Sequence, residues 1–286
     1  MSVAVEQEQE RIATPEPKEH FVQADGLRWH VVEEGDGPTV LLVHGTAASV
    51  HSWRKVIPHL SARFHVVALD LPGHGQTTSR GSSDLTLPRM ASGVAAVMKA
   101  LGLSPKIVAG HSAGAAILAE AASRKLIAPT TLVSFNGAFF PFGGLAGSLF
   151  SPIAKFVAFN PFVPRLLSGV ARQSTVERLL RDTGSEPDPE DIEHYFRLFK
   201  DPDHVAAALG MMAAWDLSTM EQALARIEAS CIFVAGDNDK AVPPASADRA
   251  ASRCRHAVTL HYRGYGHLLH EENPRLAAGI IMGLET

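Results

Sequence analysis

The feature of this sequence that most restricts its fold is a series of short, mostly apolar runs. These runs lie at 39–43, 65–69, 106–109, 131–135, 231–235 and 258–262. A strand that is buried on both faces of a parallel sheet has this pattern, because neither row of its side chains meets water. Helical patterns at 87–101, 115–122 and 245–252 separate several of the runs. The alternation predicts an α/β fold with a mostly parallel, doubly wound sheet, preceded by a hairpin that turns at Asp25-Gly26.

Composition and charge exclude several classes of protein. The 286 residues are 46% hydrophobic and 20% charged, which is typical of a soluble globular protein, and the net charge of −4 predicts no nucleic-acid partner. The cysteines Cys231 and Cys254 form no disulfide framework, which indicates a reducing compartment. No apolar run reaches the roughly 18 residues of a spanning helix, and the polar start of the chain does not resemble a secretory signal. We therefore expect a cytoplasmic protein.

The alternation of strands and helices stops at Asn136 and resumes near residue 220. The segment between them has no clean strand pattern but has helical patterns at 191–199 and 205–214. An insertion of this kind covers the carboxyl ends of the strands, where ligands bind in open α/β sheets. We expect three parts, which are a disordered tail at 1–19, a core made of 20–136 and 220–286, and a helical cap at 137–219.

The strongest chemical signal is Gly110-His111-Ser112-Ala113-Gly114, which fits the pattern G-x-S-x-G. An apolar run precedes it and a helical pattern follows it. A sharp turn from strand to helix lifts the serine hydroxyl off the edge of the sheet, and glycines on both sides avoid clashes in the turn. Ser112 is therefore the candidate nucleophile, and we expect His111 to shape the turn or the pocket beside it.

A serine nucleophile needs an orienting carboxylate, which should follow a strand that ends at the same edge of the sheet. Asp237 and Asp239 follow the run at 231–235. Asp237 comes directly after Gly236 and can cap its own turn, a common role for aspartate. We favour Asp239, because it lies further round the loop and is better placed to reach a histidine.

The nucleophile also needs a base, and His267 and His270 both follow the last predicted strand. His267 comes after Gly266, which permits a tight turn into the site. We place His270 in the first turn of a helix, where we expect Glu271 and Glu272 to be solvated. We therefore favour His267 as the base.

The oxyanion of an acyl-transfer reaction needs two N–H donors. We assign one to the backbone of Ala113. The loop after the first parallel strand supplies the other, and there we assign the backbone N–H of Thr46, because Gly45 lets that backbone come close. His44 is expected to brace the loop.

Five motifs together resemble the α/β-hydrolase superfamily, from about residue 21 to the C-terminus. They lie at 44–46, 70–75, 110–114, 236–243 and 266–267. Within it, the chain is similar to the magnesium-chelatase accessory proteins of bacteriochlorophyll biosynthesis. The segments that carry this narrower resemblance are 44–49, 51–54, 110–118, 135–147, 151–155, 160–164 and 211–217.

The superfamily resemblance implies a serine hydrolase that needs no metal and no organic cofactor. The narrower one implies a role near the insertion of magnesium into protoporphyrin IX, with a tetrapyrrole intermediate as ligand and magnesium chelatase subunits as partners. Asn136 stands where some relatives place their acid, and it cannot serve as a carboxylate. A serine at position 112 also argues against dehalogenase and epoxide hydrolase chemistry, which needs an aspartate there.

The first part of the predicted cap is rich in phenylalanine, with Phe139 and Phe142 as the first pocket candidates. These rings either pack the cap onto the sheet or line an apolar pocket for an acyl or tetrapyrrole ligand. We add four residues to the candidate pocket, which are Trp53, His111, Asn136 and Trp215. A third interpretation is peripheral contact with the inner membrane, with Lys155 and Arg165 near the lipid headgroups.

Two functions follow from the sequence. The first is a serine hydrolase that acts on an ester or similar acyl bond of a small hydrophobic substrate. The second is a binding protein that uses the same scaffold to hold or deliver a porphyrin to magnesium chelatase. Fold resemblance does not decide between them.

Overall fold

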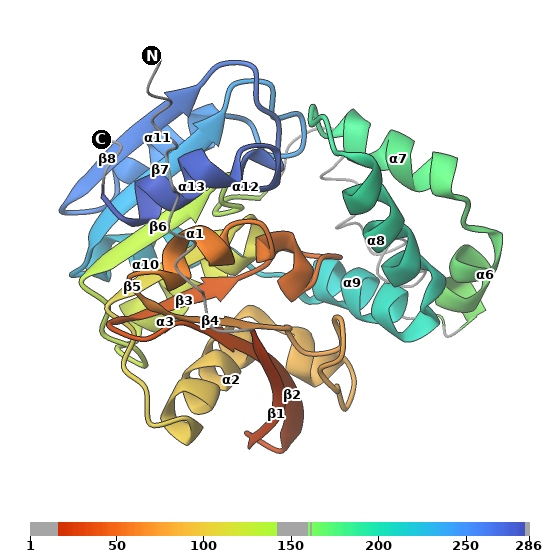
Figure 1. Cartoon of the computed structure of the whole chain (residues 1–286), viewed down its shortest axis with the longest axis horizontal. Coiled ribbons are helices and arrows are strands. Elements are labelled where there is room, and N and C mark those ends of the chain that lie inside the picture. Colours follow the sequence, from red (N-terminus) through yellow and green to blue (C-terminus); the bar gives the residue numbers. More distant parts are fainter. Residues whose placement is uncertain (1–16, 142–159, 161, 284–286) are drawn as a thin grey trace, which may run out of the picture.

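The computed structural model describes residues 17–141, 160 and 162–283. Its centre is one eight-stranded sheet with the order β1-β2-β4-β3-β5-β6-β7-β8 (Figure 1). The strands are β1 (Lys18–Ala24), β2 (Leu27–Glu34), β3 (Thr39–Val43), β4 (His65–Leu69), β5 (Ile107–His111), β6 (Thr131–Phe135), β7 (Ser230–Gly236) and β8 (Ala257–Tyr262). All neighbours from β4 to β8 are parallel, whereas β1 and β2 are antiparallel to each other and β2 is antiparallel to β4. The predicted α/β fold with a mostly parallel sheet is confirmed.

The β1–β2 hairpin turns where the sequence predicts it. Asp25 and Gly26 have φ values of 51° and 75°, so both residues are left-handed, as a tight two-residue hairpin turn requires. The hairpin adds the two antiparallel strands to one edge of the sheet.

Helices cover both faces of the sheet because its central strands are apolar on both sides. In β3, Leu41 and Val43 enter one core cluster and Val40 and Leu42 the other, which is the two-residue alternation of a strand. The first cluster includes residues of α2 (Leu87–Ala100), α3 (Ala113–Ser123), α10 (Met220–Arg226) and α11 (Ala245–Ala251). The second includes residues of α1 (Ile57–Ser61) and α13 (Pro274–Ile281), with the short helices η1 (Val50–Trp53) and α12 (Leu269–Glu272) at one end.

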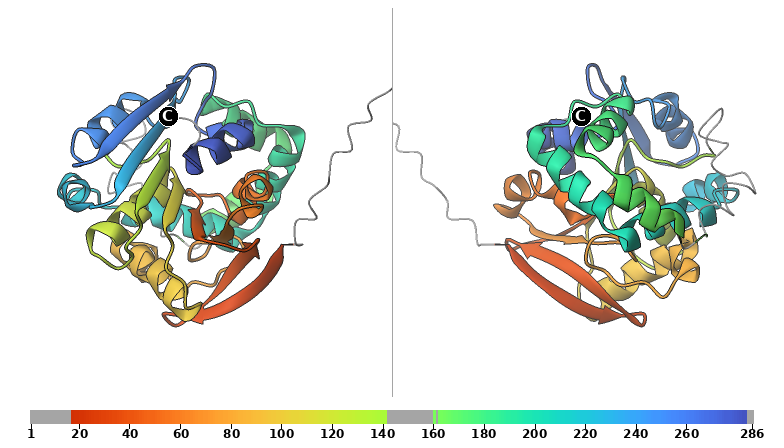
Figure 2. Two further views of the ribbon diagram at one scale, coloured as in Figure 1. Left: turned by 60° about the vertical axis from the view of Figure 1, so that its left-hand side comes forward. Right: turned by 90° about the vertical axis from the view of Figure 1, so that its right-hand side faces the viewer.

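Among the described residues, a group of four helices lies between β6 and α10. They are α6 (Phe162–Val170), α7 (Gln173–Asp182), α8 (Pro189–Lys200) and α9 (Pro202–Ala214). The two helical patterns predicted at 191–199 and 205–214 fall inside α8 and α9. Figures 1 and 2 show the four helices together on one side of the molecule.

The starts of α8 and α9 are fixed by local chemistry. Asp188 accepts a hydrogen bond from the backbone N–H of Asp191, and Asp201 accepts one from that of Asp203, each at 2.9 Å. A proline follows each capping aspartate, and proline fits the first helical position because it has no N–H to satisfy. No helix within the described ranges is long and apolar enough to cross a membrane.

Candidate active site

Ser112 lies at the turn from β5 into α3, with φ of 49° and ψ of −115°. A residue other than glycine adopts this backbone only where its surroundings hold it there. The flanking glycines allow the turn. A Cβ atom on Gly110 would lie 2.5 Å from the backbone nitrogen of Ala115, and one on Gly114 would lie 2.3 Å from the carbonyl oxygen of Val43. The turn therefore presents Ser112 at the carboxyl end of β5, as the motif predicts.

Asp239 and His267 meet beside this edge of the sheet. Asp239 follows β7, His267 follows β8, and Nδ1 of His267 lies 2.8 Å from Oδ2 of Asp239. Both residues are buried. The competing Asp237 instead lies 3.1 Å from Nδ1 of His261 at the surface. The structure thus brings together the acid and the histidine that the sequence favours.

The carboxylate of Asp239 is completely enclosed and has four donors. Its Oδ1 accepts hydrogen bonds from the backbone N–H groups of Ala241 and Val242, each at 2.8 Å. Its Oδ2 accepts from Nδ1 of His267 and, at 2.7 Å, from Nδ2 of Asn136. A buried ionised carboxylate is tolerated when donors surround it in this way. The arrangement holds the imidazole with its Nε2 as the free nitrogen.

Asn136 was predicted to line the substrate pocket, but the structure places it against the carboxylate of Asp239. It follows β6 with φ of 50°, and its amide touches the carboxylate of Asp239 and the carbonyl of Gly266. Asn136 is only 3% exposed, so it does not face an open pocket, and its role here is to donate a hydrogen bond to Asp239.

The two other histidines near His267 are buried. Nε2 of His111 lies 2.9 Å from the backbone carbonyl oxygen of His267, and the two rings are 4.7 Å apart. His111 thus holds the loop that carries His267. His270 lies 4.5 Å from the ring of Trp53, and burial lowers its pKa to about 3, so it is neutral.

The loop after β3 approaches Ser112 closely. A Cβ atom on Gly45 would lie 3.0 Å from Cβ of Ser112. His44 holds this loop as expected, because its Nδ1 lies 2.7 Å from the carbonyl oxygen of Gly45 and its Nε2 accepts a hydrogen bond from Leu71 N–H at 2.9 Å. Burial lowers the pKa of His44 to about 4, so the ring is the neutral tautomer that both bonds need.

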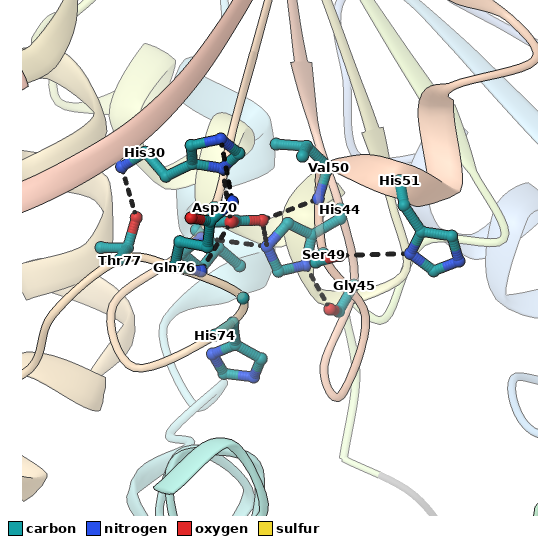
Figure 3. Close-up of polar contacts among 12 residues, drawn as sticks. His30, His44, Gly45, Ser49, Val50, His51, Asp70, His74, Gln76 and Thr77 are labelled. Carbon is teal, nitrogen blue, oxygen red and sulfur yellow. Dashed lines mark hydrogen bonds and ion pairs between the residues drawn. The ribbon is translucent and has the colours of Figure 1, made fainter. Parts of the chain in front are cut away.

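Asp70 is a buried centre that joins this loop to the loop after β4 (Figure 3). Its carboxylate accepts hydrogen bonds from His30 Nδ1 at 2.8 Å, from Val50 N–H at 2.7 Å and from Gln76 N–H at 2.9 Å. Burial alone would raise the pKa of Asp70, but the bond from His30 and its other donors hold it below the ordinary value. Asp70 therefore braces the loop that contains Gly45.

Most of the predicted pocket residues pack inside the protein. Trp53 is fully buried against Phe135, and Phe139 is fully buried against Phe233, with ring centres 5.9 and 5.4 Å apart. Trp215 is half-buried beside the core. Phe142 lies outside the described residues. Large aromatic rings fill cores more often than they line sites, because burying such a ring removes a large area of apolar surface from water.

Two cavities lie between the core and the inserted helices. One, of about 610 Å³, has Thr77, Ser79 and His204 in its lining. The other, of about 510 Å³, has His30 and His194 in its lining. Over the part of the chain that the structure describes, neither cavity includes the candidate nucleophile or a predicted pocket residue.

A cluster of charged side chains that the sequence analysis did not predict joins α8 to the core. His51, Asp191 and Glu271 place possible metal-ligating atoms within 4.8 Å of one another. However, Arg54 Nη1 lies 2.6 Å from one oxygen of Asp191, and Lys55 Nζ lies 2.9 Å from the other. Because two cations already neutralise Asp191, we interpret the cluster as an ion-pair network.

Glu271 was expected from the sequence to be solvated, but it is buried, with 4% of its surface exposed. Tyr195 of α8 donates a hydrogen bond to its Oε1 at 2.7 Å. Burial, followed by the nearby charge of Asp191, raises the pKa of Glu271 to about 8. Its burial depends on α8, which is 76 residues away in the chain, so the local sequence carries no signal for it.

Comparisons with known proteins identify the family and relatives of the chain. A family model described as the alpha/beta hydrolase family matches residues 40–279. The chain is 40% identical over 262 residues to the "Magnesium-chelatase 30 kDa subunit" of Rhodobacter capsulatus, covering 90% of each chain. It is 26% identical to the "Uncharacterized hydrolase YugF" of Bacillus subtilis, covering 83% of this chain and 86% of that protein.

The fold is also similar to that of solved structures. A putative lipase from Acinetobacter baumannii aligns with a TM-score of 0.78 and 19% identity, covering 93% of this chain and 90% of the other. An esterase from Thermogutta terrifontis aligns with a TM-score of 0.76 and 22% identity, covering 93% and 97%. At these identities the likeness concerns the fold.

The bond from Asn136 to Asp239 predicts a measurable coupling. Asn136→Leu removes one donor from a buried carboxylate, which should lower the free energy of unfolding in urea by about 1.5–3 kcal/mol. In an Asp239→Asn background the acceptor is neutral and the lost bond is weaker, so the same change should cost about 0.5–1.5 kcal/mol. Equal costs in the two backgrounds would show that the Asn136 amide does not interact with the charge of Asp239.

Glu271 predicts a pH dependence of stability. Its pKa is raised in the folded state, so the folded protein binds the proton more tightly than the unfolded chain, and stability is lost as the pH rises toward the folded pKa of about 8. Urea unfolding between pH 5 and 9 should show a loss that approaches ~1.4 kcal/mol per pH unit from this group. Glu271→Gln keeps an acceptor for Tyr195 but cannot ionise, so its curve should be flatter. Parallel curves for the two proteins would contradict the assignment.

Proposed function

The chain belongs to the α/β hydrolase family, and on that premise we propose that it is a serine hydrolase that cleaves an ester or another acyl bond. The observation that carries the proposal is the 2.8 Å contact between His267 and the enclosed carboxylate of Asp239. The strained turn at Ser112 and the close approach of Gly45 to it support the same chemistry.

In the proposed reaction, Ser112 Oγ attacks the carbonyl carbon of the substrate while His267 Nε2 takes the hydroxyl proton. The carboxylate of Asp239 stabilises the imidazolium. The backbone N–H groups of Thr46 and Ala113 stabilise the oxyanion. When the tetrahedral intermediate collapses, the bond to the leaving group breaks and His267 protonates that group. Water then hydrolyses the acyl-enzyme, with His267 again acting as base.

The loops of this site are held by groups that do not react. His44 and Asp70 hold the loop that contains Thr46, through Gly45 on one side of it and Val50 on the other, and His111 holds the loop of His267. The proposed reaction uses these protein groups and water, with no step that requires a metal or an organic cofactor. The helices α6–α9 would form the cap over this edge of the sheet.

We place the activity near the magnesium-chelatase step of bacteriochlorophyll biosynthesis. The support is the 40% identity, over 90% of both chains, to a protein named as a magnesium-chelatase subunit. The substrate would be a small hydrophobic ester or a tetrapyrrole intermediate, and chelatase subunits would be the protein partners.

A second candidate function is a porphyrin-binding protein that delivers its ligand to the chelatase. The specific observation in its favour is that this relative is named as a chelatase subunit and not as a hydrolase. In that case the contact between Asp239 and His267 would stabilise the scaffold, and Ser112 would not react.

Hydrolysis of p-nitrophenyl butyrate by matched variants tests the proposal. Ser112→Ala removes the nucleophile and should lower kcat by about 10⁴-fold or more. Asp239→Ala leaves the imidazole without its orienting partner and should cost about 10⁴-fold. Asp237→Ala is the control from the same loop and should stay within a few-fold of the parent.

If the protein instead binds a porphyrin without hydrolysing it, the same assays should give the opposite results. The parent would then hydrolyse no ester faster than Ser112→Ala does, and it would bind protoporphyrin saturably in an absorbance titration. Full rescue of pigment synthesis by Ser112→Ala in a strain that lacks the gene would also remove hydrolysis from the role in the cell.

A further inference from the structure

One surface of the inserted helices exposes far more apolar side chain than the rest of the described protein. Among the described residues, eight large hydrophobic side chains are exposed, and five of them fall between 162 and 179. Phe162 is 72% exposed, Leu166 64%, Val170 63%, Leu179 46% and Leu167 44%. A contiguous group of apolar side chains on a solvent-exposed face marks a contact surface, whereas single exposed apolar residues are normal.

Four of these side chains lie on one side of α6. Residues 162, 166, 167 and 170 follow the helical repeat, and the buried Pro164 and Ser168 lie on the opposite side. That opposite side packs against α8 and α9. Lys200 of α8 donates to the carbonyl oxygens of Ser168 at 3.0 Å and Gly169 at 3.3 Å. These contacts fix α6 with its apolar side turned away from the protein.

The charge of the same segment is positive. Residues 162–182 contain four arginines and two carboxylates, in a chain whose net charge is −4. Arg165, Arg172 and Arg178 are exposed, and within the described residues no carboxylate forms an ion pair with them. Arg181, in contrast, is paired with Glu177 and Glu186.

We propose that α6 and the start of α7 dock onto an anionic lipid bilayer. The apolar side of α6 would enter the boundary between headgroups and acyl chains, as in amphipathic helices that lie in the membrane interface. Arg165 and Arg172 would extend to the lipid phosphates, because a long basic side chain keeps its charge in the polar layer.

The charge argues for lipid over a second copy of this chain. In a symmetric dimer each patch contacts the same patch of its partner, so Arg165 and Arg172 would meet arginines of like charge. A bilayer with negative headgroups offers both the apolar layer and the opposite charge. Figure 1 shows α6 and α7 at the side of the molecule away from the sheet, and in Figure 2 (right) this side faces the viewer.

Co-sedimentation with large vesicles tests the proposal. The full chain should bind vesicles of equimolar phosphatidylcholine and phosphatidylglycerol, bind phosphatidylcholine vesicles much more weakly, and lose affinity as salt is added. The affinity of the variant Leu166→Ser/Val170→Ser for these vesicles should be lower than that of the parent by about tenfold or more. Arg165→Gln/Arg172→Gln should lose about fivefold per arginine at low salt. The control is Val258→Ser, a 50% exposed apolar residue on β8, which should bind like the parent.

Three results would overturn the proposal. The first is a parent protein that is folded by circular dichroism but does not bind the anionic vesicles. The second is equal binding by the parent and both α6 variants. The third is a parent dimer in light scattering that becomes monomeric in Leu166→Ser/Val170→Ser, since the surface would then join two copies. Hydrolysis of a soluble ester should be the same in parent and α6 variants, so this test is independent of the proposed reaction.

Discussion

The buried carboxylate of Asp239 is the group on which the arrangement of the candidate site depends. It is enclosed completely, and it connects three strand ends through the backbone after β7, the imidazole of His267 after β8 and the amide of Asn136 after β6. Such a group is stable only when every lone pair is satisfied, so its donors must all be in place together. Because parallel strands end at one edge, residues that are distant in sequence converge there with Ser112, which follows β5.

Much of this could be predicted from sequence because the signals are local. Short apolar runs predicted the strands of the sheet, and the glycines around Ser112 predicted the sharp turn. The turn needs glycine at position 114 because the backbone there passes close to Val43. The choice of Asp239 over Asp237 also used a local argument, since the residue after the glycine can close its own turn. The two-strand hairpin at Asp25-Gly26 followed from turn chemistry alone.

The rest depends on contacts between distant segments. Asn136 meets Asp239 across 103 residues, and the burial of Glu271 depends on the position of Tyr195 in α8. Neither contact leaves a pattern in the residues around it. The aromatic candidates Trp53 and Phe139 were misleading for a related reason, because the same side chains suit a ligand pocket and a core, and here they pack in the core. The outward side of α6 needed the structure too, since a periodic apolar pattern normally indicates a buried side.

The central claim is that Ser112 is a nucleophile that His267 activates in the folded protein. The most direct measurement is mass spectrometry of the protein after treatment with a fluorophosphonate, with the adduct mapped to a peptide. We expect one adduct on Ser112 in the native protein, with little adduct after urea unfolding or in His267→Ala. No adduct in the native protein, or an adduct of equal yield in His267→Ala, would contradict it.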